Sequence, residues 1–89
     1  MWFAVRPRGL ESTETIVSYL FLINGQEVTV AGTEIDGLIY QEKALREDKV
    51  SCIRLSGGTV GESYMITLRY GTETIPSDDK SFYINVAET

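Results

Sequence analysis

The sequence contains no histidine, and it has only one cysteine and two prolines among its 89 residues. Without histidine the chain cannot build a Ser-His-Asp or Cys-His triad, or a zinc site with histidine ligands. The lone cysteine, Cys52, cannot form an intrachain disulfide or a thiolate zinc site. It stands in the apolar-rich stretch KVSCIRL, which favours a small buried core residue over a reactive thiol. We therefore expect no metal, no cofactor and no enzymatic activity.

Positive charge is also scarce. The chain has 8 Lys+Arg against 13 Asp+Glu, a formal net charge of −5. Binding to nucleic acid requires clustered positive charge, so nucleic acid is not an expected partner. Only Arg6 and Arg8 stand close together, and they are either ordinary solvated charges or a basic anchoring point.

Long apolar runs are absent as well. No stretch approaches the length that crosses a bilayer. The first residues lack the basic region, the sustained apolar run and the cleavage site of a signal peptide. A secreted domain of this size usually carries disulfides. These features predict a soluble protein with no membrane partner that folds in a reducing cytosol.

The sequence does contain short β-rich segments separated by turn residues. Alternation and β-branched or aromatic content predict strands at 2–6, 15–23, 26–30, 38–42, 49–55, 63–70 and 80–86. The expected core contains Phe21, Ile53, Ile66, Leu68, Phe82 and Ile84. We predict a single all-β domain over residues 1–89, an immunoglobulin-like antiparallel β-sandwich of about seven strands.

Two segments in the middle of the chain carry more detailed expectations. Asn24-Gly25 predicts a type I′ hairpin turn, which needs positive φ at both residues. The following alternation places Val28 and Val30 on a buried face. The segment 41–49 is rich in helix formers and charges, and both an exposed edge strand and a short turn of helix remain open.

Three stretches, TETIVSYLF, IRLSGGTVGESYMITLRY and DDKSFYINV, together resemble a group of small bacteriophage proteins with an immunoglobulin-like fold. The most specific part is in register at Leu55, Ser56, Gly57, Gly58, Thr59, Gly61 and Tyr64. The region 24–50 departs from the pattern, and Phe21 stands where a tryptophan is common, so the middle strands stay open.

The resemblance implies a structural protein of the virion, of the capsid-decoration, head–tail or tail-accessory type. Its partners would be capsid or tail proteins of the same particle, contacted by many copies in a symmetric assembly. The resemblance implies no catalytic residue. The alternative is a fibronectin-like or immunoglobulin-like adhesion module of a cellular surface protein. The remaining class, a small enzyme or ligand carrier, lacks a catalytic constellation.

Tyr64 and the glycines before it also have a physical interpretation. A tyrosine near the start of a late strand resembles the tyrosine corner of sandwich domains, in which the hydroxyl bonds to nearby backbone. Loss of one such bond would cost about 0.5–1.5 kcal/mol. Gly57, Gly58 and Gly61 are expected to supply positive φ in the preceding turn. A binding role for Tyr64 is the alternative.

Two apparent ligand motifs do not hold up. The stretch SGGTVG lacks the Lys-Ser/Thr end of a phosphate-binding loop, and a strand follows it where a helix would be needed. Asp78, Asp79 and Glu73 could coordinate calcium, but their spacing matches no EF-hand, which favours a polar hairpin tip.

The N-terminal stretch is the candidate partner contact. Trp2, Phe3, Arg6 and Arg8 combine aromatic area with guanidinium groups, and both kinds of side chain are over-represented at interface hot spots. The alternative is that one aromatic ring packs on the core while the other lies along the surface.

Overall fold

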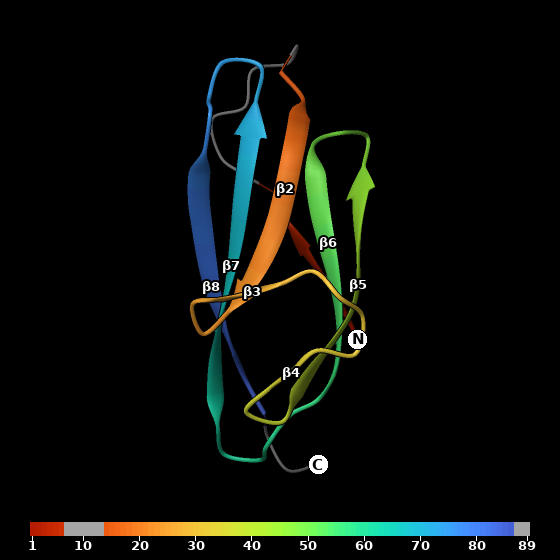
Figure 1. Cartoon of the computed structure of the whole chain (residues 1–89), viewed down its shortest axis with the longest axis vertical. Coiled ribbons are helices and arrows are strands. Elements are labelled where there is room, and N and C mark those ends of the chain that lie inside the picture. Colours follow the sequence, from red (N-terminus) through yellow and green to blue (C-terminus); the bar gives the residue numbers. More distant parts are fainter. Residues whose placement is uncertain (7–13, 87–89) are drawn as a thin grey trace.

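The computed structural model describes residues 1–6 and 14–86, and these residues form eight strands and no helix (Figure 1). The strands are β1 (Trp2–Val5), β2 (Ile16–Ile23), β3 (Gln26–Val28), β4 (Glu34–Ile35), β5 (Leu38–Arg46), β6 (Val50–Gly57), β7 (Ser63–Thr72) and β8 (Asp78–Asn85). Within this described part, no helix is long and apolar enough to span a membrane.

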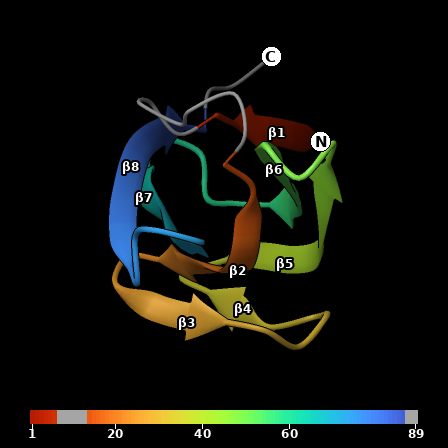
Figure 2. The same ribbon diagram turned by 90° about the horizontal axis from the view of Figure 1, so that it is seen from above.

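The strands build two antiparallel sheets of four strands each, in the orders β1-β6-β5-β4 and β3-β2-β7-β8. The view along the long axis shows β3 and β4 beside one another on one side and β1 and β8 on the other (Figure 2). The predicted all-β sandwich is confirmed. It has one strand more than the expected seven, because two residues before the Asp36-Gly37 turn pair with β5 as the short strand β4.

The core lies between the sheets and is formed by alternate residues of the long strands. Phe21, Ile53, Ile66 and Leu68 are each 0 % exposed, as their alternation predicts. Phe82 and Ile84 also face inward, but they are only partly buried. The reason is position, since among the described residues β8 has a neighbouring strand on one side only.

The β2–β3 hairpin has the predicted turn. Asn24 and Gly25 have φ of 49° and 81°, and Ile23 pairs with Gln26 across them. Val28 is buried as expected, whereas Val30 is 68 % exposed, so that part of the prediction was wrong. The alternation stops because β3 ends at Val28 and the chain turns away towards β4.

The ambiguous segment 41–49 belongs to a strand and its turn. β5 runs from Leu38 to Arg46 and pairs with β6 along its whole length, which rules out the short helix. Because β4 pairs only with Leu38 and Ile39, the charged remainder of β5 is a sheet edge. The edge-strand alternative is the correct one.

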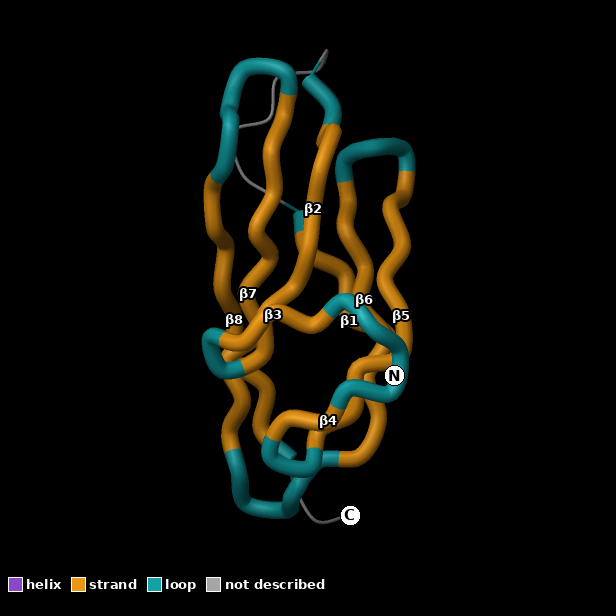
Figure 3. The backbone as a smooth tube through the Cα atoms, in the orientation of Figure 1, coloured by secondary structure: helices purple, strands orange, loops and turns teal. Residues whose placement is uncertain are grey.

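Tyr64 joins two loops that lie together at one end of the sandwich (Figure 3). Its side chain is 1 % exposed. The hydroxyl donates to the carbonyl oxygen of Asp36 at 2.6 Å and accepts from the amide of Thr59 at 2.9 Å. The turn between β4 and β5 is thereby tied to the loop between β6 and β7. Gly57 ends β6, and Gly58 and Gly61 lie in that loop; their φ values are 74°, 102° and 89°.

Candidate docking surface

The outer face of β1, β6 and β5 carries a row of three small side chains. Ala4 and Ala44 both pair with Cys52, one from each side of β6. Alternation points all three away from the core, opposite Val5 and Ile53. Small side chains leave this row lower than its surroundings. We call the resulting depression the trough, with Ala4, Cys52 and Ala44 as its floor.

The first wall of the trough is the row Trp2–Arg54–Glu42. Arg54 pairs in register with Trp2 on β1 and with Glu42 on β5. Its Nη2 donates to Oε2 of Glu42 at 2.8 Å, and its guanidinium carbon lies 5.8 Å from the centre of the Trp2 ring. The charge of Arg54 is thus paired, while Trp2 keeps 47 % of its surface exposed.

The second wall contains Arg6, Val50 and Arg46. Arg46 and Val50 pair across β5 and β6, and Arg6 follows directly after β1. A hollow of about 500 Å³ lies over the floor between Trp2 and Arg46. An adjoining hollow of about 590 Å³ is bordered by Ala4, both arginines, Val50 and Glu47. On this side the trough is therefore bordered by two arginines and one glutamate.

The charge of this face differs from that of the chain. Arg6 and Arg46 form no ion pair with any described residue. The face holds three arginines, including Arg54, and two acidic residues, Glu42 and Glu47. The chain as a whole has a net charge of −5. The trough is a locally positive surface on a negatively charged protein.

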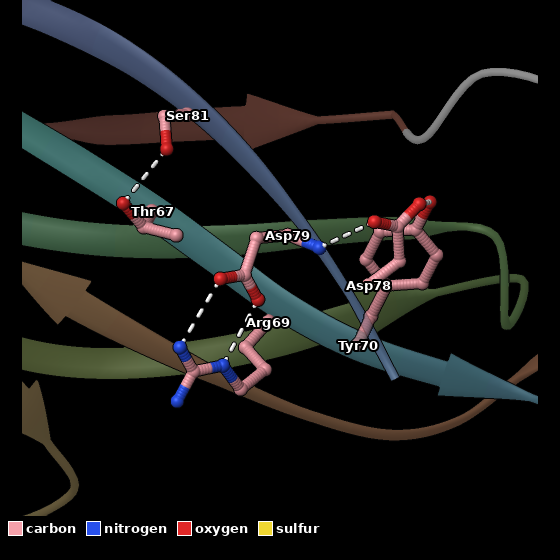
Figure 4. A network of polar contacts seen from close by, with 6 residues as sticks. All are labelled: Thr67, Arg69, Tyr70, Asp78, Asp79 and Ser81. Atoms are coloured by element: carbon pink, nitrogen blue, oxygen red, sulfur yellow. Dashed lines mark hydrogen bonds and ion pairs between the residues drawn. The ribbon is translucent and has the colours of Figure 1, made fainter. Parts of the chain in front are cut away.

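On the outer face of the other sheet, several polar side chains bind one another (Figure 4). Arg69 holds Asp79 through two hydrogen bonds of 2.9 and 3.1 Å, from Nε to Oδ1 and from Nη2 to Oδ2. This contact lowers the pKa of Asp79 below its usual range. Thr67 and Ser81 share a hydrogen bond of 2.8 Å. Unlike Arg6 and Arg46, the arginine on this face is already engaged.

The four residues predicted as a partner contact do not lie together. Trp2 and Arg6 border the trough. Phe3 also borders the hollow over its floor, but the Phe3 ring packs on Phe82 on the core side of β1, with ring centres 6.1 Å apart. This is the alternative arrangement, with one ring on the core and the other along the surface. Arg8 lies outside the described residues.

Phe3 instead helps to line an apolar hollow of about 550 Å³ at the open side between β1 and β8. The other residues that line it include Leu38, Leu55, Ile84 and Val86. Phe3 therefore belongs to the packing between the sheets.

Sequence reasoning missed the contribution of β5 and β6 to this surface. Ala44, Arg46 and Arg54 lie beside Trp2 and Arg6 only because of the register of three strands. The alternation of KVSCIRL predicts the outward position of Arg54, because it puts Arg54 on the other face of the strand from Ile53, which was expected in the core. For Ala44 and Arg46 no such prediction was possible, because the segment 41–49 was equally consistent with a strand and with a short helix.

The candidate calcium ligands are otherwise engaged. Oε1 of Glu73 accepts from the amide of Thr15 at 2.7 Å, and the hydroxyl of Thr15 donates to Oε2. These bonds lower the pKa of Glu73. The carboxylate of Asp79 is bound by Arg69. Across residues 1–6 and 14–86 no group of three or more acidic, cysteine or histidine residues is arranged to hold a metal.

Comparison with known protein families places the chain in a defined class. Residues 3–85 match the family model described as podophage GP4 fiber-tail adaptor protein gp77. The chain belongs to this family. It is therefore a bacteriophage structural protein, a virion component that acts by binding other tail proteins, as the resemblance in the sequence implied. No curated protein and no solved structure matches the chain.

Proposed function

We propose that this adaptor attaches to a neighbouring tail protein through the trough on β1, β6 and β5. The observation that supports it is the combination on one face of a half-exposed Trp2, a small-residue floor and two arginines, Arg6 and Arg46, that form no ion pair with a described residue. Exposed tryptophan and arginine side chains dominate binding energy at many interfaces. The three strands beneath them are paired in register, so the backbone of the trough is already ordered before binding.

The adaptor acts without catalysis, in many symmetry-related copies, and binds neither nucleic acid nor membrane. The absence of histidine, the burial of Cys52 and the net charge of −5 support this part of the proposal. It is synthesised in the host cytoplasm before it joins the virion. Multiple copies compensate for weak single contacts, because each attachment raises the effective concentration of the next.

Residues 1–89 form one immunoglobulin-like domain in this proposal. The neighbours β1-β6-β5 correspond to strands B, E and D of such a sandwich, and β8-β7-β2 to G, F and C. Tyr64, near the start of β7, acts as the tyrosine corner, and Gly57, Gly58 and Gly61 shape the loop that it closes.

Replacement of Trp2 by alanine tests the docking surface. We expect Trp2→Ala to retain its fold, because the side chain is half exposed, and to be depleted from purified virions. Val30→Ala is the matched control, since Val30 is an exposed apolar residue away from the trough. Folding is checked by circular dichroism and incorporation by quantitative mass spectrometry. Wild-type stoichiometry of folded Trp2→Ala would contradict the proposal.

A further inference from the structure

We propose that the trough binds an extended acidic segment of a neighbouring tail protein. Its carboxylates pair with Arg6 and Arg46, and an apolar side chain between them rests on Ala4, Cys52 and Ala44. This inference depends on the proposed function, because it assigns the chemistry of the partner that the docking surface receives.

Charge complementarity carries the first step. Arg54 already forms an ion pair with Glu42 at 2.8 Å, which reduces its attraction for a second carboxylate. Arg6 and Arg46 border one hollow and have no ion pair within the described residues. Guanidinium groups bind carboxylates in a bidentate geometry, which makes carboxylate the matching ligand. Glu47 borders the same hollow, so the ligand's carboxylates are placed towards the arginines and away from that turn.

The dimensions of the trough carry the second step. Arg6 follows β1 and Arg46 ends β5, with one strand between them, so their backbones are about 10 Å apart. Alternate side chains of an extended segment point to the same side and lie about 7 Å apart. The arginine side chains are long and can bend towards one another, so they can make up the difference between these two spacings. An extended segment with carboxylates at alternate or nearby positions therefore reaches both arginines.

The floor selects polypeptide over nucleic acid. Ala4 and Ala44 offer apolar surface on either side of the buried Cys52, and Trp2 adds an aromatic wall. Two glutamates on the same face would repel a phosphate backbone, which needs a more extended positive surface. A segment that combines carboxylates with an apolar residue satisfies both the arginines and the floor.

A peptide titration tests the ligand class directly. Trp2 is the only tryptophan, so its fluorescence reports on the trough without a label. The probe is a synthetic decapeptide of alternating glutamate and leucine, and the same peptide with glutamine in place of glutamate is its control. We expect the glutamate peptide to shift the Trp2 emission at low salt, with weaker binding as salt rises, and the glutamine peptide to leave it unchanged.

Two matched double variants assign the effect to the arginines. Arg6→Gln with Arg46→Gln lowers the net charge by two, and so does Val30→Glu with Val60→Glu at exposed positions away from the trough. We expect about tenfold weaker peptide binding for the arginine pair, the loss of two charge-assisted contacts, and wild-type affinity for the valine pair. Equal affinity of the two double variants would overturn the inference. So would a larger emission shift with a single-stranded oligonucleotide than with the peptide.

Incorporation into virions separates this inference from the proposed function. We expect the arginine variant to be depleted from particles and the valine variant to be retained. If the arginine variant is retained while Trp2→Ala is lost, the trough docks a partner, but the acidic segment is wrong. If both are retained at wild-type level, the docking surface itself is wrong.

Discussion

Replacement of Tyr64 by phenylalanine removes one hydroxyl and two hydrogen bonds. A single bond is worth about 0.5–1.5 kcal/mol, and a buried group left without a partner costs about 1–3 kcal/mol. The carbonyl of Asp36 retains a longer bond from Thr59 Oγ1 at 3.3 Å, but the amide of Thr59 loses its bond to the hydroxyl. We therefore expect Tyr64→Phe to lower the free energy of unfolding by about 2 kcal/mol, more than the estimate for one bond.

For a domain of this size, that loss corresponds to a decrease in Tm of about 8–16 °C. The assay is thermal and urea unfolding followed by circular dichroism. Tyr83→Phe is the control. It removes the same hydroxyl group, but Tyr83 is 70 % exposed, so no buried hydrogen bond is lost. We expect its Tm to stay near that of the wild type. Equal Tm values for the two variants would refute the argument that the Tyr64 hydroxyl locks the loops.

Two further predictions concern the glycines and acid stability. Gly58→Ala should lower the free energy of unfolding by about 1 kcal/mol or more beyond the effect of Gly61→Ala. Both glycines have positive φ, but a Cβ at Gly58 would lie 2.7 Å from a valine side chain, whereas Gly61 faces open space. Equal urea midpoints of unfolding for the two glycine variants would contradict this prediction. Hydrogen bonds lower the pKa of Asp79 and of Glu73 in the folded state, so their contribution is present above the unfolded-state values and is lost as pH falls below about 4. Asp79→Asn should reduce the decrease in Tm between pH 5 and pH 3, and an unchanged decrease would count against it.

The sequence was sufficient where local chemistry decides the structure. Asn24-Gly25 defines its hairpin turn alone, and the alternation around Ile66 and Leu68 identifies a buried strand. It was insufficient for 41–49, where helix-forming residues make up a strand because β6 pairs with it. The turn after it contains Glu47 and Asp48 with φ of 51° and 56°. Aspartate adopts positive φ more readily than most residues, but glutamate is not a usual residue for that conformation.

The docking surface was predictable only in part for the same reason. The placement of Trp2 near the chain start and of Arg6 after β1 marked the first strand as a candidate contact. The sequence could not show that Phe3 turns inward, because the alternation of a four-residue strand does not say which face is buried. Nor could the sequence show that Ala44 and Arg46 lie beside the first strand's residues on the same face, since that requires the register between β5 and β6.

The arrangement of β1 connects recognition with stability. β1 has four residues, and β6 is its one strand partner within the described part of the chain. Beyond β1, Lys80 Nζ donates to the carbonyl oxygen of Arg6 at 2.7 Å. A ligand in the trough contacts side chains of β1 and β5 at once, so it would hold this short edge strand against the rest of the sheet. Because a ligand that binds only the folded state stabilises it, attachment to the tail would raise the stability of a small domain whose own core is limited. The outward residues of β1 and β6 make the contact while their inward neighbours, such as Val5 and Ile53, build the core. Substitutions in the trough should therefore weaken assembly while leaving the isolated protein folded.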